Sequence, residues 1–356
     1  MNSRSIPSHT VPPQTTADPT PLQFHRGPLG EVASLPGVLL GARLLAPQAM
    51  PLPTAAGSSV QPVHAELITP AVSTLDAWFT PASVSLSQHG CVHLASDGHW
   101  LHGSAQLDPA VVEGGLERAA WRIYTDLFGA LAEHSSPHLL RLWNYVPGIN
   151  DHGDGLEHYR HFNIGRQRAF IEAGRSAFEG SPAACAVGTS GSALQVCFLA
   201  GAGVPLAIEN PRQLSAYRYP VQYGPRSPTF SRAALASVGG GRQALFISGT
   251  ASIQGHESMH VGDVRRQTEE TLLNIAALLE AAQRQASVSV PIDALCCTVY
   301  LRHREDWAAV LDVLQRRIGP HSHAVRTAVV LRADICRADL LVEIEAHAVL
   351  PVEGGR

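Results

Sequence analysis

The order strand, Gly-[Ser/Thr]-Ala, long helix, strand occurs twice along this chain. In the first copy the segments are LHGSAQL (101–107), an apolar helical stripe (109–133) and LLRLWNYV (139–146). In the second they are FISGTASI (246–253), a stripe (263–282) and ALCCTVYL (294–301). Apolar residues spaced three and four apart indicate a helix, whereas short apolar runs bounded by turns indicate strands. A duplicated unit of this size is a domain, not a solenoid repeat.

Each copy continues through a shorter helix to two closing strands, which we predict to form hairpins over 183–200 and 324–349. A sheet with helices on one face and antiparallel closing strands is an α+β architecture. The 356 residues suffice for about two ordinary domains. The expected segments are a proline-rich arm or irregular segment (1–55), an N-terminal domain (56–215) and a C-terminal domain (216–356).

Charge and composition exclude several classes of function. All 26 positively charged residues are arginine, so the chain lacks the lysine needed for Schiff-base or pyridoxal-phosphate chemistry and for a Walker A loop. A GC-rich genome would produce the same bias towards arginine. The arginines are scattered and the net charge is −4, so we expect neither a nucleic-acid nor a membrane partner, and no cofactor.

The cysteines indicate a reducing environment. The six thiols form neither a CxxC pair nor a disulfide framework, and they lie at 91, 185, 197, 296, 297 and 336. This pattern is typical of a cytoplasmic protein, and no apolar run is long enough to span a membrane. We expect a monomer or a homo-oligomer.

The closing segment VEIEAHAV has a strand's alternation. Glu343, Glu345 and His347 face one side, and the apolar residues between them face the other. From the pattern alone, these three are either the wet face of an edge strand or the site of a carboxylic acid that donates a proton.

The stretch HESMH (256–260) matches the zinc-binding pattern H-E-x-x-H, with Glu280 further along as a conceivable third ligand. That pattern requires both histidines on one helix. Gly255 and Gly262 bracket the stretch, and Asp263 has the features of an N-cap for the next helix. Glu280 would then lie about 30 Å from His260, so we expect no metal site.

The second copy resembles the RidA (YjgF) family along its whole length, through SPTFSRA, ISGTASI, GDVRRQTEETLLNIAALLEAA, TVYLRHREDW and LVEIEAHAV, in that family's order. Over about residues 90–350 the chain resembles more specifically the chorismatases, which consist of two RidA-like halves and remove pyruvate from chorismate. The motifs are LRLWNYVPGIND (140–151), GLEHYRHFNIGRQRAF (155–170), ENPRQLSAYRYPVQYGPRSPTFSRA (209–233) and SGTASIQGHES (248–258). The resemblance implies two RidA/YjgF-like (chorismate mutase-like) halves, each a mixed sheet with helices packed on one face, and an active site at their interface.

The resemblance also implies roles for particular residues. It places the catalytic general acid at Glu343, the first glutamate of EIEA, and leaves Glu345 as a framework residue. Chorismate carries two carboxylates, and arginine offers a planar fork to each. Two Tyr/Arg sets lie in the matching motifs as candidate substrate-binding residues: Tyr159 with Arg166, and Tyr219 with Arg232. Without the resemblance they would be read as surface arginines and packing tyrosines; rivals for the same role are Arg212, Arg218, Arg226 and Arg302.

Gly249 and Cys336 match the branch of the family that forms 3-hydroxybenzoate, with 4-hydroxybenzoate as a second product. The hydrolytic branch, which yields a dihydroxycyclohexadiene carboxylate, carries alanine in place of the glycine. Each residue also has a purely structural interpretation. Gly249 can be a turn glycine that needs a positive φ, and Gly103 at the equivalent position of the first copy favours this interpretation. Cys336 can be a small buried hydrophobic residue. A nucleophilic thiolate would need nearby positive charge, for which Arg326, Arg332 and Arg337 are candidates. A RidA-type imine deaminase and a non-catalytic small-molecule binder remain as alternatives.

Overall fold

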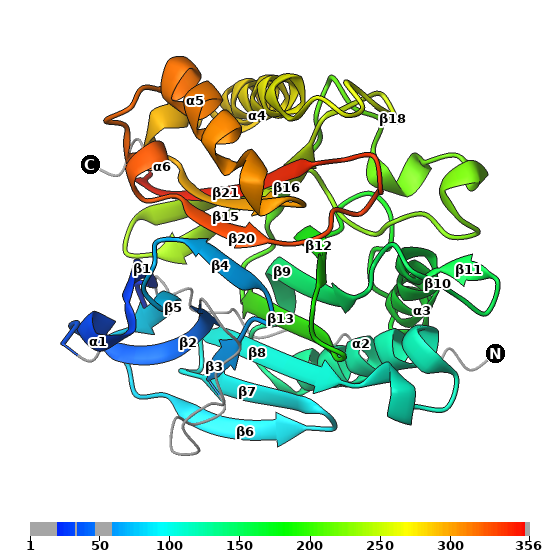
Figure 1. The fold of residues 1–356 in the computed structure, drawn as a ribbon. Coiled ribbons are helices and arrows are strands. Elements are labelled where there is room, and N and C mark those ends of the chain that lie inside the picture. Colours follow the sequence, from blue (N-terminus) through cyan, green and yellow to red (C-terminus); the bar gives the residue numbers. More distant parts are fainter. Residues whose placement is uncertain (1–19, 33, 47–58, 353–356) are drawn as a thin grey trace, which may run out of the picture.

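The structure is a computed structural model that describes residues 20–352, apart from 33 and 47–58. Three large sheets form the molecule (Figure 1). No helix within the described ranges is long and apolar enough to cross a bilayer.

The N-terminal half is built on a six-stranded sheet of order β12-β9-β13-β8-β7-β6. Its strands are β6 (Ser85–His89), β7 (Val92–Ser96), β8 (Trp100–Leu107), β9 (His138–Pro147), β12 (Ala183–Thr189) and β13 (Leu194–Gly201). Helices α2 (Gly115–Glu133) and α3 (His158–Glu172) cover one face. Helix α2 buries Leu116, Ile123, Leu127 and Leu131, which is the stripe that predicted it.

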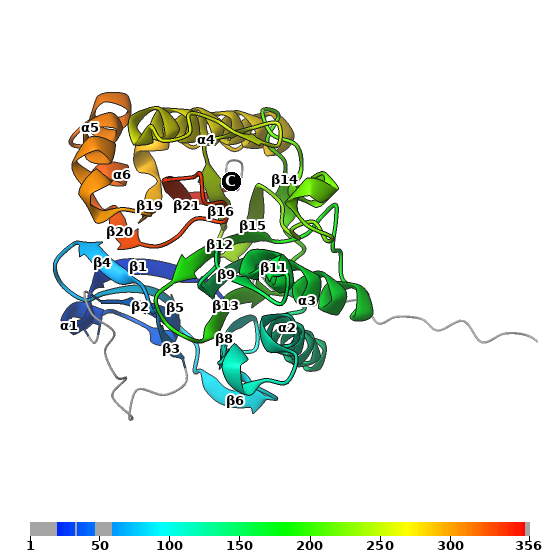
Figure 2. The same ribbon diagram turned by 45° about the vertical axis from the view of Figure 1, so that its right-hand side comes forward.

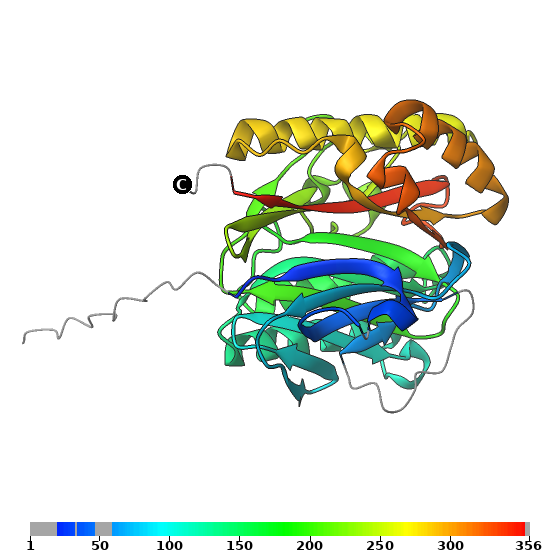
Figure 3. The ribbon, with the colours of Figure 1, turned by 90° about the vertical axis from the view of Figure 1, so that its left-hand side faces the viewer.

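The C-terminal half has a seven-stranded sheet of order β14-β15-β16-β21-β19-β20-β4. Its strands are β4 (Glu66–Thr69), β14 (Leu206–Ile208), β15 (Ala233–Gly239), β16 (Arg242–Ala251), β19 (Cys296–Leu301), β20 (Val329–Arg332) and β21 (Val342–Pro351). Its helices are α4 (Val264–Ala286), α5 (Trp307–Ile318) and α6 (His323–Arg326). Figure 3 shows α4 and α5 over the outer face of this sheet. Asp263 caps α4 by accepting a hydrogen bond from the Arg266 amide, as predicted.

The two halves share one connectivity, but the predicted closing hairpins are wrong. Strand β12 runs parallel to β9, whereas β13 lies antiparallel between β8 and β9. Likewise β20 runs parallel to β19, and β21 lies antiparallel between β16 and β19. The short helix before each closing pair forms a crossover, which delivers the next strand parallel to its predecessor. The last strand then inserts at the centre of each sheet.

A third, four-stranded sheet of order β1-β5-β2-β3 precedes the duplicated units. It consists of β1 (Gln23–Pro28), β2 (Val38–Leu45), β3 (Val60–Pro62) and β5 (Thr74–Thr80), with α1 (Leu29–Val32) nearby. The expectation of an irregular segment over 1–55 is therefore wrong for β1 and β2, because these short apolar runs find partners in β5. Residues 1–19, 33 and 47–55 of that segment lie outside the described residues. Strands β4 and β14, both within the expected N-terminal domain, join the C-terminal sheet.

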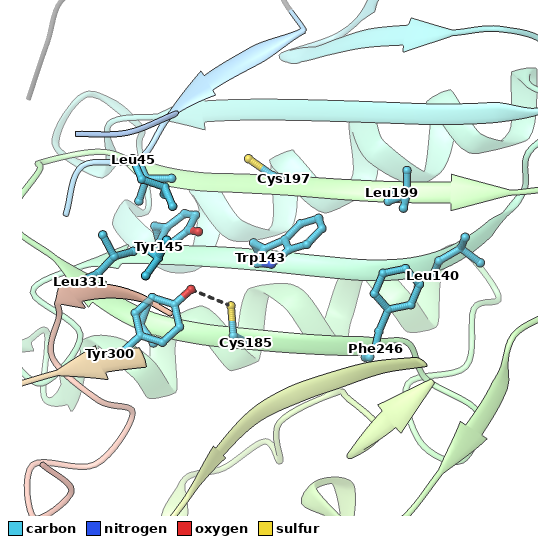
Figure 4. Close-up of a cluster of buried hydrophobic side chains, with 14 of the residues drawn as sticks. Leu45, Leu140, Trp143, Tyr145, Cys185, Cys197, Leu199, Phe246, Tyr300 and Leu331 are labelled. Carbon is cyan, nitrogen blue, oxygen red and sulfur yellow. Dashed lines mark hydrogen bonds between the residues drawn. The ribbon is translucent and has the colours of Figure 1, made fainter. Parts of the chain in front are cut away.

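One buried core lies between the three sheets (Figures 2 and 4). It contains Trp78 from the four-stranded sheet, Trp143 and Tyr145 from β9, Phe246 from β16 and Tyr300 from β19. Separate cores lie under the helices of each half. The inner faces of the two halves therefore pack against each other, and the candidate site lies at their interface.

Candidate active site

A cavity of about 440 Å³ opens between the two halves. Its wall contains all seven predicted site residues: Tyr159, Arg166, Tyr219, Arg232, Gly249, Cys336 and Glu343. Helix α3 of the N-terminal half supplies the first Tyr/Arg set, and the connection between β14 and β15 supplies the second. Strand β16 supplies Gly249, the loop between β20 and β21 supplies Cys336, and β21 supplies Glu343. The site therefore requires both halves, as the interface prediction implied.

Strand β21 places its carboxylates in the interior. Glu343 is 3% exposed and Glu345 is 4% exposed, because β21 is a central strand paired with β16 and β19. The interpretation of these residues as a solvated edge face is therefore wrong. His347, the third residue of this face, packs its ring against Phe24 of β1 at a centroid separation of 4.1 Å.

Glu345 is fully paired. Its Oε1 accepts from Arg43 Nη1 at 3.0 Å and from Trp143 Nε1 at 3.2 Å, and its Oε2 accepts from Arg141 Nη2 at 2.5 Å. Burial acts to raise the pKa of Glu345, but the opposing charges of Arg141 and Arg43 lower it to about 2. Glu345 is therefore an anion at every working pH.

Glu343 has the opposite environment. No group in the described parts of the chain donates a hydrogen bond to its carboxyl, which borders the cavity. Burial, and then the negative charge of Glu345, raise the pKa of Glu343 to about 8, against the smaller opposing effects of Arg141 and Arg232. At neutral pH this carboxyl holds its proton, as a general acid must.

Gly249 provides space for that carboxyl. A Cβ at this position would lie 2.7 Å from Glu343 Cδ, nearer still to Oε1, and 3.2 Å from Cys185 Cβ. Neither Gly249 nor Gly103 has a positive φ, so that reading of both glycines is wrong. A Cβ at Gly103 would collide with the ring of Phe198. In both halves the glycine allows a side chain of the neighbouring strand to pack directly over the backbone.

The Cys336 thiol is neutral. Burial and the nearby Glu343 raise its pKa to about 12, although Arg337 and Arg232 oppose the change. Of the three arginines named as possible activators, Arg337 acts on the thiol through its charge, whereas Arg332 pairs with Glu66 at the protein surface. The arrangement provides an S–H group beside Glu343 and does not provide a thiolate nucleophile.

Four guanidinium groups line the cavity: Arg160 pairs with Glu157 at 3.6 Å, and the other three have N–H groups to spare within the described residues. Arg166 is 2% exposed, and its Nε and Nη2 have no hydrogen-bond partner among the described residues. Arg232 donates through Nη2 to Tyr219 Oη at 2.8 Å, and its Nε is likewise free within the described structure. The Arg337 Cζ lies 4.0 Å from the centre of the Tyr223 ring, and Arg337 Nη2 has no hydrogen-bond partner in the described part of the chain. Buried unpaired donors are costly, so this wall suits an anionic ligand.

Comparison with known proteins identifies the family. Residues 76–200 match the family described as chorismatase FkbO/Hyg5-like, N-terminal, and residues 230–350 match endoribonuclease L-PSP. A chorismatase from Streptomyces rapamycinicus is 39% identical over 283 residues, which cover 77% of this chain and 81% of the relative. This chain belongs to the chorismatase family.

Two further comparisons agree with this assignment. A 3-hydroxybenzoate synthase from Streptomyces hygroscopicus is 36% identical over 280 residues, covering 76% of this chorismatase-family chain and 80% of the relative. A crystal structure of a chorismatase superposes with a TM-score of 0.82 at 32% identity, covering 92% of this chain and 98% of the other. The resemblance seen in the sequence, and the α+β fold of two RidA-like halves, are confirmed.

The site of this chorismatase excludes the rival arginines. Arg212, Arg218, Arg226 and Arg302 do not line the cavity. Arg212 pairs with Glu270, and Arg302 pairs with Asp334 at 2.6 Å. Arg212 and Arg302 are therefore neutralised by carboxylates of the protein, and Arg218 and Arg226 lie outside the cavity wall.

Sequence reasoning missed several cavity residues, among them Tyr223 and Cys185, and it named Arg337 only as a neighbour of the thiol. The signal for Arg337 was its position directly after Cys336, and that for Tyr223 was its position four residues after Tyr219. Nothing in the sequence of β12 distinguishes Cys185 from an ordinary buried thiol.

The H-E-x-x-H stretch of this chorismatase is not helical. It includes the short strand β18 (Glu257–Ser258), which pairs with β17 (Ile253–Gln254). Across the ranges that the structure describes, no group of three histidine, cysteine or acidic residues could hold a metal ion. The stretch instead supports the cavity wall, since Arg337 Nη1 donates to the His256 carbonyl at 2.8 Å.

Proposed function

We propose that this chain converts chorismate to 3-hydroxybenzoate and pyruvate, with Glu343 as the general acid. The proposal rests on one observation above all: the buried Glu343 carboxyl borders a cavity whose wall also presents guanidinium donors that are unpaired within the described residues. The family to which the chain belongs supports chorismate as the substrate.

The cavity suits a small dianion. Its volume of about 440 Å³ lies within the range usual for small-molecule sites. Chorismate has one carboxylate on the ring and one on the enolpyruvyl side chain, so it needs two separate clamps. Arg166 on α3 and Arg232 before β15 supply these from opposite halves, while Tyr159 and Tyr219 add directed phenol groups.

Glu343 begins the reaction by donating its proton to the terminal CH2 carbon of the enolpyruvyl group. This protonation converts the enol ether into an oxocarbenium ion. The carboxylate that remains then stabilises the developing cation by its charge. Its low-polarity surroundings, which favour the protonated form beforehand, make it a strong electrostatic partner once ionised.

Gly249 and Cys336 support the 3-hydroxybenzoate branch. Pyruvate and hydroxybenzoate together contain every atom of chorismate and no others, so the branch has no net water uptake. Gly249 leaves room for the Glu343 carboxyl beside the ring, and the neutral thiol can donate a weak hydrogen bond to the departing C4 hydroxyl. One water adds to the oxocarbenium carbon, and the resulting hemiketal splits into pyruvate and the ring C3 hydroxyl. The C4 hydroxyl leaves as water and the C3 hydrogen as a proton, so one water is consumed and one is released. Departure of the C3 oxygen with pyruvate instead gives 4-hydroxybenzoate from the same bound substrate.

Product analysis tests this assignment. The protein is incubated with chorismate in oxygen-18 water, and the aromatic products are separated and analysed by mass spectrometry. We expect mainly 3-hydroxybenzoate that retains the substrate's C3 oxygen, together with an equal amount of pyruvate. A dihydroxycyclohexadiene carboxylate as the main product would contradict the branch and leave chorismate cleavage intact; absence of pyruvate would contradict the whole proposal.

We place this reaction in a reducing, cytoplasmic setting. The placement is supported by the six cysteines, all of which are free thiols.

A further inference from the structure

We propose that Glu345 is a positioning residue whose fixed negative charge, anchored by Arg43 of the N-terminal four-stranded sheet, keeps Glu343 protonated between turnovers. The inference rests on the proposed role of Glu343 as the acid. It gives the four-stranded sheet, which lies outside the duplicated halves, a part in catalysis.

The register of β21 brings the two carboxyl groups together. Glu343 and Glu345 are alternate residues of one strand, so they project from the same face about 7 Å apart along the backbone. One is paired on both oxygens and the other on neither. Two buried carboxyl groups at this separation cannot both ionise readily, so the paired residue takes the charge and the unpaired residue keeps the proton.

A chain of alternating charges links Glu345 to the four-stranded sheet. Arg43 on β2 donates to Glu345 at 3.0 Å and to Asp76 on β5 at 2.7 Å. Asp76 in turn accepts from Arg26 on β1 at 2.6 Å. These four side chains are at most 7% exposed. The network leaves Glu345 with a fixed partner that water does not screen.

The placement of these charges is unusual for a sheet that only packs. Ala42, Leu44, Leu75 and Ala77 form an apolar core on the outer face, whereas Arg43 and Asp76 alternate with them and face inward. Apolar residues of similar size would pack at least as stably at buried positions, because burying two charges costs more hydration than their pairing returns. Holding an anion deep in the core is a function that apolar residues cannot perform.

The other charged groups around the two carboxyls are of both signs: the carboxylates Glu157, Glu257 and Asp339 also line the cavity, and Asp76 lies behind Arg43. The charges that act on Glu343 itself are those of Glu345, Arg141 and Arg232. The cations are Arg43 on β2, Arg141 on β9, Arg160 and Arg166 on α3, and Arg232 and Arg337 in loops. Burial raises the pKa of each neighbouring phenol and thiol and lowers that of His347, and these groups are Tyr145, Tyr159, Tyr300, Cys185, Cys336 and His347. The charge acting to keep Glu343 protonated is therefore that of Glu345.

A charge cycle tests the inference through the pH profile of kcat/KM for pyruvate release. The wild-type profile should fall above about pH 8, where Glu343 loses its proton. In Glu345→Gln the falling limb should move to lower pH by about 1–2 units, because the repelling charge is gone. In Arg141→Met it should move to higher pH, and the double variant should return close to the wild type.

Arg43→Met should move the limb to higher pH, as Arg141→Met does, because Arg141 still keeps Glu345 ionised and the Glu345 charge is then less compensated. Arg265→Met is the matched control, since Arg265 makes an exposed ion pair with Asp312 away from the cavity. A merely structural role would lower rates without moving the limb in opposite directions. The inference is overturned if Glu345→Gln leaves the limb in place or moves it to higher pH.

Carbon-13 NMR of the Glu343 carboxyl, without substrate, gives a second reading independent of activity. Its titration should move by the same amounts as the kinetic limb. If Glu345→Gln fails to fold, it is combined with Arg141→Met. The double variant removes both partners of one ion pair, so neither partner is left as an unpaired buried charge. Compared with Arg141→Met alone, the double variant should show the Glu343 titration at lower pH. A protein whose Glu343 titration moves as expected but which cleaves no chorismate would contradict the proposed function and not the charge-setting role.

Discussion

Glu343→Gln should stabilise the folded protein at alkaline pH while removing its acid. In the unfolded chain this carboxyl ionises near 4.5, whereas in the folded protein it keeps its proton until about pH 8. Between these values the folded state binds more protons, so the wild type loses stability as pH rises. At 1.36 kcal/mol per pH unit, the full loss above pH 8 is on the order of 5 kcal/mol. Glutamine avoids this loss because it does not ionise.

Urea denaturation of wild type and variant at pH 5 and pH 9 measures the effect. The free energy of unfolding of Glu343→Gln, relative to the wild type, should rise by several kcal/mol between the two pH values. Glu345→Gln is the matched control, because the pKa of Glu345 is lowered to about 2 and its ion pairs stabilise the fold at both pH values. That variant should be less stable at both. A relative stability of Glu343→Gln that is the same at pH 5 and pH 9 would refute the protonated state assigned to Glu343.

Two further predictions concern substrate and product. Arg166→Ala and Arg232→Ala should each raise KM for chorismate by the loss of a charge-assisted clamp worth about 2–4 kcal/mol, whereas the exposed control Arg226→Ala should leave KM unchanged; an unchanged KM in Arg232→Ala would remove that residue from the clamp. Gly249→Ala combined with Cys336→Ala should shift the product towards the dihydroxycyclohexadiene carboxylate, measured by chromatography; a product ratio equal to that of the wild type would show that these two positions do not set the branch.

Much of the fold could be predicted because local patterns specify it. The spacing of Leu116, Ile123 and Leu127 predicts α2, and Asp263 marks the start of α4, through interactions within a few residues. The order of strands within a sheet depends on distant pairings, so the local pattern predicts hairpins where each closing strand in fact pairs with an earlier strand. Strand β2 was hidden by its proline-rich surroundings, since its partner β5 begins 29 residues after it ends.

The site could be predicted in part for the same reason. Alternation along one strand places Glu343 and Glu345 on a shared face, and this needs no tertiary information. Which of them is ionised depends on Arg43, which lies 302 residues before Glu345, and on Arg141, 204 residues before it. No pattern within a few residues of Glu345 predicts its ion pairs with Arg43 and Arg141. The close approach of Glu343 to Gly249 also depends on pairing between two separated strands.

In the proposed reaction, the protonated Glu343 carboxyl starts the cleavage of the enol ether of chorismate. The most direct test compares pyruvate release from chorismate at pH 7 by the wild type, Glu343→Gln and Glu345→Gln, followed with a coupled lactate dehydrogenase. We expect the wild type to release pyruvate. The rate for Glu343→Gln should be about 10²–10⁴-fold lower, because an amide cannot transfer a proton to carbon. The rate for Glu345→Gln should fall far less. A Glu343→Gln variant that releases pyruvate at the wild-type rate would contradict the proposed role of Glu343.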